Sequence, residues 1–344
     1  MKALVKTQKG KGFLELRDVP EPRPQAGEVM IEIAACGICG TDIHVRHDEF
    51  PYWPPVILGH EFTGTIVEAG PECRTARIGQ RVVAEPHTKA CGHCPLCRTG
   101  NSQICPEKRS PGWGIDGGMA KYICYPEKLL HRLPDGMTFD QGAMVEPTAN
   151  VVSDVIDRAR ITTGDFAVVI GPGPIGLLAA MVARAAGARE VVLIGTPSDV
   201  NLRLAKAKEL GFTTLNLGEV NPVNAVMEMT GGIGADIVVE CSGSPRAISG
   251  TIDLVRKMGK ICAIGLTGNR PVELAWDKFN FKVVDLLFNL STSYTSWDRT
   301  ISLIHKGLVP AEKLITHRAP LGQWEEVFSA VENLQALKGL LIPC

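Results

Sequence analysis

The sequence predicts a two-domain α/β protein in which a mostly β half precedes a doubly wound parallel sheet. Short β-branched runs broken by Gly and Pro fill residues 1–150. From about Ile161, apolar strands alternate with Ala- and Leu-rich helices. A glycine-rich turn at residues 171–176 lies between the first of these strands and the first helix.

Length and composition agree with this prediction. The chain has 344 residues, enough for about two domains, and its 45% apolar content is ordinary for a globular protein. Lys plus Arg (36) nearly balance Asp plus Glu (37), which argues against nucleic acid or an acidic membrane as the partner. No apolar stretch is long enough to cross a bilayer, and the N-terminus lacks a signal core. We expect a cytoplasmic protein with a small-molecule partner.

The first half has the sequence pattern of antiparallel strands. Residues 28–33 and 65–67 are β-branched or alternate between apolar and polar side chains, as half-buried strands do, and Gly and Pro mark the turns between them. Few helical stretches interrupt this half, which we assign to residues 1–150.

The second half reads as alternating strands and helices, a pattern typical of a parallel sheet with helices on both faces. Residues 300–344 return to a mixed character. The strands predicted here span residues 166–170, 191–194, 237–240 and 261–264, and the helices span 175–186 and 202–210.

The glycine-rich turn has the form G-x-G-x-x-G. Gly171 permits the tight turn, Gly173 lets the backbone approach a pyrophosphate, and Gly176 allows helix and strand to pack closely. Pro174 and Ile175 open the helix, whose N–H groups would face the anion. The turn predicts dinucleotide binding, the alternative being a glycine-rich turn in a domain that binds no cofactor.

The choice between NAD and NADP stays open. The second strand ends in Gly195, where an NAD-binding chain is expected to carry Asp or Glu for the adenine ribose. Thr196 and Ser198 follow, and Asp199 is the nearest acid, although Ser198 and Asp199 are equally candidates for the N-cap of the next helix. Arg203 is a candidate for a 2′-phosphate or an exposed helical side chain. We lean towards NAD.

Four cysteines predict a structural metal site. Their C-x2-C-x2-C-x7-C spacing, in a loop rich in Gly and Pro, can fold four thiolates around one zinc ion. Two disulfides or four unrelated thiols are the alternatives, but close CxxC spacing suits one shared ion better than two strained bridges. The four are Cys91, Cys94, Cys97 and Cys105.

A second, different metal site is indicated by Cys39, His60, Glu61 and Glu146. These residues offer one thiolate, one imidazole and two carboxylates, a mixed set that leaves room for water or substrate, as catalytic zinc requires. Such an ion lowers the pKa of an alcohol and stabilises the alkoxide from which a hydride leaves. Taken singly, each residue is more often a buried thiol, a core histidine or a surface acid. Other histidines are expected to be surface or loop residues: His47, His87, His93 and His131.

Together these motifs make the chain resemble the zinc-dependent medium-chain dehydrogenases, and most closely the sorbitol and related polyol dehydrogenases. The resemblance covers nearly the whole chain. It implies a GroES-like β-barrel catalytic domain at residues 1–150 with its zinc lobe at about 87–110, a Rossmann domain at 151–295, and a segment at 296–344 that returns to the catalytic domain. The residues that carry it are Gly59, His60, Glu61, Gly64, Gly70, the four cysteines of the lobe, Gly171 to Gly176, and Glu146 with Pro147.

The resemblance also implies roles for individual residues. Cys39 and His60 would bind the catalytic zinc, with Glu61 as a direct or alternating ligand. Glu146 would bind the metal or its water, and it is the discriminating residue, since simple alcohol dehydrogenases of the family usually carry Cys there. Thr41 and His44 match the positions from which the family passes a proton from the substrate, through the ribose hydroxyls, to solvent.

The leading hypothesis is an NAD(P)-dependent oxidation of a secondary alcohol of a polyol or sugar alcohol to a ketone. A threonine 3-dehydrogenase-like enzyme or a sugar-phosphate alcohol dehydrogenase is the alternative within the family. From another class, a non-catalytic dinucleotide-binding sensor would share the fold, but would be expected to lack the metal ligands. The resemblance further implies a homo-oligomer, a dimer or tetramer, paired through an edge strand at residues 283–290.

Overall fold

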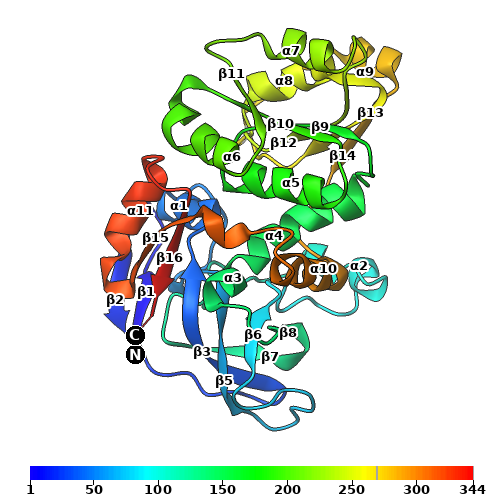
Figure 1. The fold of residues 1–344 in the computed structure, drawn as a ribbon. Helices are drawn as coiled ribbons and strands as arrows, with labels where there is room; N and C mark the ends of the chain where they lie inside the picture. Colours follow the sequence, from blue (N-terminus) through cyan, green and yellow to red (C-terminus); the bar gives the residue numbers. More distant parts are fainter. Residues whose placement is uncertain (269, 344) are drawn as a thin grey trace. The chain divides into compact units, whose positions relative to one another are not determined.

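A computed structural model describes residues 1–268 and 270–343. The chain forms two compact units (Figure 1). The first comprises Met1–Ala149, Ser291–His305 and the chain from Ala311 on, and the second comprises Asn150–Leu290 and Lys306–Pro310. The predicted combination of a mostly β unit and a doubly wound unit is therefore confirmed.

The first unit is built on two sheets. A seven-stranded sheet has the order β15-β16-β3-β5-β6-β8, with β7 also paired to β3, and a smaller sheet has the order β2-β1-β4. All pairs are antiparallel except β15 with β16. The strands are β1 (Lys2–Lys6), β2 (Leu14–Asp18), β3 (Glu28–Gly37), β4 (Val56–Ile57), β5 (Glu61–Ala69), β6 (Arg81–Ala84), β7 (Tyr122–Pro126), β8 (Leu130–Arg132), β15 (Ile315–Pro320) and β16 (Lys338–Ile342).

The last strand of the chain joins this sheet beside the strand that leads to the predicted metal site. In the β16–β3 ladder, Leu340 lies opposite Gly37 and Leu341 opposite Cys36. Strand β5 pairs with the other side of β3 and places Glu61 opposite Gly37. Residues from the beginning and the end of the sequence therefore meet around the end of β3.

Short helices complete the first unit. Helix α4 crosses from the first unit into the second, because the division falls between Ala149 and Asn150. The helices are α1 (Gly40–Arg46), α2 (Pro95–Arg98), α3 (Phe139–Ala143), α4 (Val145–Val152), α10 (Tyr294–His305) and α11 (Trp324–Glu332).

The second unit is a six-stranded sheet in the order β11-β10-β9-β12-β13-β14, parallel throughout. The order reverses between β9 and β12, which is where doubly wound folds bind their ligands. The strands are β9 (Phe166–Ile170), β10 (Glu190–Gly195), β11 (Thr213–Asn216), β12 (Ala235–Glu240), β13 (Val255–Ala263) and β14 (Asp285–Phe288).

Helices cover both faces of this sheet. In Figure 1, α5 and α6 lie on one side and α7, α8 and α9 on the other. All of the strands predicted for this half are present, and β9 is buried at every position. The helices are α5 (Pro174–Ala185), α6 (Ala205–Glu209), α7 (Pro222–Met229), α8 (Pro245–Leu254) and α9 (Trp276–Lys282).

Two local details differ from or refine the prediction. The helix predicted at 202–210 starts as a π-helical turn at Val200–Leu204 and becomes α-helical only at α6. The apolar run at 283–290 contains β14, which is an edge strand as predicted. Among the described residues, no helix has both the length and the apolar character needed to span a membrane.

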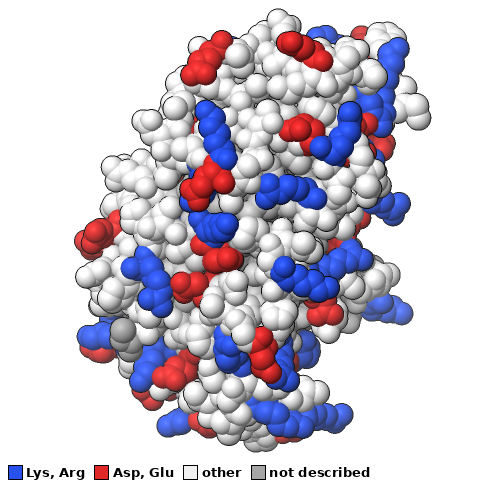
Figure 2. All heavy atoms as spheres, viewed as in Figure 1, with Lys and Arg blue, Asp and Glu red and all other residues white. Residues whose placement is uncertain are grey.

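The face of the molecule seen in Figure 2 carries no dominant charge. Figure 2 shows acidic and basic side chains interspersed over the visible face, in agreement with the near balance of the sequence. A protein with such a surface exerts no strong long-range attraction on a highly charged polymer.

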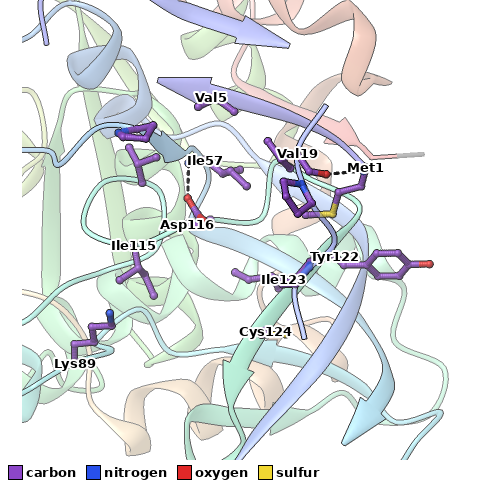
Figure 3. Close-up of a pocket in the computed structure, with 15 residues that line it drawn as sticks. Met1, Val5, Val19, Ile57, Lys89, Ile115, Asp116, Tyr122, Ile123 and Cys124 are labelled. Atoms are coloured by element: carbon purple, nitrogen blue, oxygen red, sulfur yellow. Dashed lines mark hydrogen bonds between the residues drawn. The ribbon is translucent and has the colours of Figure 1, made fainter. Parts of the chain in front are cut away.

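An open, mostly apolar pocket of about 560 Å³ lies in the first unit (Figure 3). Its acid is already engaged, since the Asp116 carboxylate accepts a hydrogen bond from the Ile57 amide at 2.9 Å. None of the predicted metal ligands or cofactor residues lines it. The pocket therefore does not serve the chemistry predicted from the motifs.

Candidate metal centres and cofactor turn

The structure gathers Cys39, His60 and Glu61 into one group. Their candidate ligand atoms all lie within 4.8 Å of one another. Cys39 precedes α1, and its amide donates to the Asp42 carboxylate at 2.8 Å, which fixes the start of that helix. His60 and Glu61 stand at the beginning of β5, buried to 4% and 1% exposure. Three residues from two neighbouring elements thus present a thiol, an imidazole and a carboxylate to one point.

The imidazole of His60 is held between a carboxylate and an aromatic ring. Its Nδ1 lies 4.0 Å from Oδ1 of Asp42, and both atoms are buried with no hydrogen-bond partner among the residues that the structure describes. The Trp113 ring meets it edge to face at 4.8 Å. Burial disfavours charged His60, but the Cys39 thiolate and the carboxylates of Asp42 and Glu146 outweigh burial and raise its pKa to about 10. The negative charges around His60 therefore favour a cation at this point.

Glu61 has a partner that the sequence did not reveal. Nζ of Lys338, on β16, donates to the Glu61 carboxylate and also to the carbonyl oxygen of Ile38 at 3.1 Å. Burial alone would lower the pKa of Lys338, but Glu61 and Cys39 outweigh it and raise the pKa. A lysine in a buried C-terminal strand carries no motif, so only the tertiary contact identifies it.

Glu146 lies close by but outside the group. It begins the first turn of α4 and is 7% exposed. It does not belong to the set of ligand atoms that all lie within 4.8 Å of one another, yet its charge raises the pKa of both His60 and Lys338. Glu146 therefore contributes to the negative field around these residues.

Helix α1 carries the two residues predicted to move a proton. Thr41 Oγ1 lies 3.8 Å from the Cys39 sulfur. His44, one turn later, is half exposed, and its Nδ1 lies 3.0 Å from a Glu49 carboxylate oxygen. Residues three apart share one face of a helix. This face of α1 therefore runs from Thr41, beside the candidate ligand Cys39, to the half-exposed His44.

The donor set fits zinc. Sulfur, imidazole nitrogen and carboxylate oxygen are the ligands that zinc takes in proteins, and fewer than four committed donors leave a position for substrate. The unpartnered buried atoms of His60 and Asp42 and the negative field around them agree with a cation at this point. Bound there, zinc would supply Lewis-acid chemistry.

The four cysteines of the lobe also converge. Cys91, Cys94, Cys97 and Cys105 place their sulfur atoms within 4.8 Å of one another. Backbone amides of Cys91, Cys94 and Cys97 each donate to a sulfur of the cluster at 3.4 Å, which stabilises thiolates over thiols. This arrangement fits a closed, structural zinc site.

The glycine-rich turn has the geometry that its motif predicts. Gly171 follows β9 with a φ of +93°, and Gly173 is the N-cap of α5 with no side-chain cap. A Cβ on Gly173 would meet nothing within 4 Å, whereas one on Gly176 would lie 1.9 Å from the Gly171 carbonyl oxygen. The turn thus leaves open space above the uncapped N-terminus of α5, where a pyrophosphate fits.

The end of β10 explains the missing acid. A Cβ on Gly195 would lie 2.9 Å from the side chains of Leu204 and Pro172, so a larger residue would require these side chains to move. Asp199 accepts from the amide and hydroxyl of Thr196 at 2.8 and 2.7 Å, and it pairs with Arg203 at 3.2 Å. Asp199 therefore serves as a capping residue, and Arg203 is a partly buried ion-pair partner rather than an exposed side chain.

One histidine prediction is wrong. His131 lies in β8 and is 5% exposed rather than in a loop or on the surface. Its Nε2 and that of His87 lie 2.9 and 2.7 Å from the Glu85 carboxylate, so one buried acid contacts both rings. The β8–β6 pairing brings His131 to this acid, and sequence spacing gives no sign of it.

Comparison with known proteins gives the same assignment. Residues 25–135 match the alcohol dehydrogenase GroES-like domain, and residues 174–306 match the zinc-binding dehydrogenase family. A sorbitol dehydrogenase from Halalkalibacterium halodurans is 38% identical over 344 residues, which cover all of this chain and 99% of that protein. A D-arabitol-phosphate dehydrogenase from Enterococcus avium is 32% identical, over 99% of this chain and 97% of that one.

A solved structure of a zinc-binding dehydrogenase from Sinorhizobium meliloti, bound to NADP, matches with a TM-score of 0.92 and 31% identity. The match covers 99% of each chain. The fold, the two clusters of ligand atoms and the full-length relatives agree with one another. The chain therefore belongs to the zinc-dependent medium-chain dehydrogenases, which transfer a hydride between an alcohol and NAD or NADP.

Proposed function

We propose that this dehydrogenase oxidises a secondary alcohol of a polyol or sugar alcohol to the ketone. The observation that carries the proposal is the ligand group of Cys39, His60 and Glu61 with a second buried carboxylate, Glu146, in place of a cysteine. The full-length similarity to a sorbitol dehydrogenase supports it. A sugar-phosphate alcohol is the second candidate, supported by the D-arabitol-phosphate dehydrogenase relative.

In this proposal Cys39 and His60 hold the zinc, and Glu61 is divided between the metal and Lys338. The bond from Lys338 neutralises part of the Glu61 charge, so Glu61 can stay near the site without permanently occupying the position that substrate needs. Glu146 accepts a hydrogen bond from a water or a substrate hydroxyl. A zinc ion held by these residues would supply Lewis-acid chemistry that lowers the pKa of the alcohol, and a bound nicotinamide would be the hydride acceptor.

Thr41 and His44 remove the proton that the alcohol loses. Thr41 stands beside the Cys39 sulfur, close enough for its hydroxyl to accept from an alcohol at the metal. His44 is half exposed and paired with Glu49, so it can pass a proton to solvent. A bound cofactor would supply ribose hydroxyls, which can also accept and donate protons in this transfer.

We propose that the chain accepts both NAD and NADP, with NAD as the working cofactor. Residues 171–176 bind the pyrophosphate, and Gly195, Thr196 and Arg203 lie where the adenine ribose is expected. NAD is favoured because Arg203 is already paired with Asp199 and is not free for a 2′-phosphate. NADP remains usable because β10 ends without a carboxylate that would repel it.

We further propose that the subunits pair through β14. This strand is an edge of its sheet, and Phe288 and Leu290 there are 64% and 67% exposed, which favours an apolar contact with a second copy. Sedimentation velocity at micromolar concentration should show a dimer or tetramer. A monomer would contradict this part of the proposal.

The function is tested by nicotinamide reduction with purified, zinc-loaded protein. NAD and NADP should be assayed in parallel against polyols, polyol phosphates and threonine, with a chelator-treated control. Turnover of a polyol or its phosphate that the chelator abolishes is the expected result. Cys39→Ser and His60→Ala should each reduce turnover to background while circular dichroism stays unchanged, and retained turnover would overturn the ligand assignment.

A further inference from the structure

Two cations follow the cysteine lobe and lie beside the proposed metal centre. The Arg109 guanidinium lies over the Trp53 ring at 4.0 Å. The Trp53 amide donates to the Trp113 carbonyl oxygen at 2.8 Å, and the Trp113 ring meets His60 at 4.8 Å. A continuous series of contacts therefore joins residues 108–109 to the imidazole of the metal group.

Of these two cations, Lys108 makes the weaker hydrogen bonds. It is half-buried, and its ammonium makes one hydrogen bond, a long one of 3.4 Å to the hydroxyl of Ser291. Within the described ranges, no carboxylate comes within 4.0 Å of it. Burial lowers the pKa of Lys108, and the charge of Glu146 opposes this. Lys108 is therefore close enough to Glu146 to sense its charge, but does not pair with it.

Arg109 adds a second positive charge, and among residues 1–268 and 270–343 no carboxylate pairs with it. Its Nη1 donates only to the backbone carbonyl oxygens of Lys108 and Glu107, at 3.1 and 3.4 Å. The backbone of Arg109 is fixed to Thr88, because the Arg109 amide donates to the Thr88 carbonyl oxygen at 3.1 Å. Stacking on Trp53 leaves other guanidinium N–H groups free to donate.

Such an arrangement has a physical cost. Removing an ammonium group from water is unfavourable unless an anion or good hydrogen bonds replace the lost hydration. A lysine serving only solubility extends its ammonium into water, whereas Lys108 is half-buried and donates to the Ser291 hydroxyl. Half-buried cations with few hydrogen bonds are found more often at functional sites than elsewhere on a protein.

We propose that Lys108, assisted by Arg109, binds an anionic group on the substrate while the reacting secondary hydroxyl lies at the metal centre. This inference rests on the proposed function and specifies its substrate class, namely an alcohol that also carries a phosphate monoester or a carboxylate. Both groups offer the oxygen acceptors that an ammonium and a guanidinium fork recognise. Glu146 keeps the neutral, hydroxyl-bearing part of the substrate separate from this anion.

The test compares matched substrates. We would measure kcat/KM for a pentitol, for the same pentitol with a terminal phosphate, and for threonine, with wild type, Lys108→Met and Lys108→Arg. The wild type should prefer one anionic substrate over the neutral pentitol by about ten- to hundredfold, the range of a charge-assisted hydrogen bond. Lys108→Met should lose most of this preference through KM, and Lys108→Arg should keep part of it.

The matched control is Lys128→Met, which removes one exposed lysine of the same unit and should change neither rate. Inorganic phosphate should inhibit wild type competitively, and Lys108→Met several-fold less. Preference for the phosphate ester or for threonine identifies the source of the anion, and either supports the proposal. Faster turnover of the neutral pentitol, or an equal loss on all substrates in Lys108→Met, would overturn it. No turnover of any alcohol would instead refute the proposed function.

Discussion

Lys338 shows how one residue can determine the environment of a candidate metal ligand, Glu61. Its ammonium and the Glu61 carboxylate are both buried and lie 277 positions apart in the sequence. If the lysine were absent, the carboxylate would remain buried with one charge unpaired. An unpaired buried charge is among the larger single destabilising effects known in proteins.

We expect Lys338→Met to lower the free energy of unfolding by about 3–5 kcal/mol, because it removes one partner of a buried ion pair. Urea unfolding of zinc-loaded protein measures this loss. Lys2→Met is the matched control, since Lys2 pairs with Asp18 at the surface and such pairs contribute at most about 1 kcal/mol. Equal effects of the two variants would show that Lys338 does not support Glu61 in this way.

Asp154 is a second residue whose environment sets a measurable property. It is 7% exposed in the second unit, and burial raises its pKa to about 7, against a hydrogen bond from Asn289. Because the folded pKa lies above the unfolded one, the folded state binds the proton more tightly. The free energy of unfolding should therefore fall as pH rises from about 4 to 7.

Asp154→Asn should remove this contribution and flatten the pH dependence over that range. The expected gain at pH 8 is about 1.4 kcal/mol for each unit by which the folded and unfolded pKa values differ. Denaturant titrations from pH 5 to 8 measure it, with the exposed Glu228→Gln as control. An unchanged slope in Asp154→Asn would mean that Asp154 is ionised at neutral pH in the folded protein.

At the scale of elements, the junction of β9 and α5 is the most constrained connection. Gly176 packs against the carbonyl of Gly171, whereas Gly173 faces open space. Replacing each glycine by alanine therefore tests two different requirements. At Gly176 the substitution tests close packing of helix on strand, and at Gly173 it tests the space needed by the cofactor. One methyl group collides with the backbone, and the other occupies the space where the pyrophosphate fits.

Gly176→Ala should lower the melting temperature by several degrees, because its Cβ would lie 1.9 Å from a carbonyl oxygen. Gly173→Ala should leave the melting temperature of the cofactor-free protein unchanged but weaken dinucleotide binding at least tenfold. Differential scanning fluorimetry and fluorescence titration with NADH measure the two effects. Unweakened binding in Gly173→Ala would place the pyrophosphate elsewhere.

Strand β16 pairs with a strand that is distant in the sequence. It adds the C-terminus to the sheet of the N-terminal unit, next to β3, and so brings Lys338 to the metal group. The return of a C-terminal segment was expected only through the family resemblance, because a short apolar strand carries no signal of its partner. Pairing between distant strands depends on the whole sheet and not on the strand's own residues.

At the scale of the whole molecule, two clusters of ligand atoms predict two zinc ions per chain. Elemental analysis after dialysis should find about two zinc atoms in wild type. His60→Ala should lose one zinc along with turnover, whereas Cys94→Ser should lose the other and destabilise the lobe, because structural zinc contributes directly to folding. Full zinc content in Cys94→Ser would contradict the four-thiolate assignment.

The sequence by itself determined the local features of this protein. Strand alternation, the G-x-G-x-x-G turn and the CxxC spacing depend on residues a few positions apart, and local geometry converts such spacing directly into structure. The four cysteines were predicted to meet and do so. So were Cys39, His60 and Glu61, although only the motifs around them made these residues stand out from ordinary core positions.

Only the tertiary structure decided which side chains contact the candidate site residues and shift their pKa values. It paired Glu61 with Lys338, placed Trp113 against His60, and buried His131 beside Glu85. These contacts join residues on different elements, and no periodic pattern encodes them, because each depends on the register and packing of several strands at once. The chemistry of the site was therefore readable from local motifs, while its charges and partners follow from the fold.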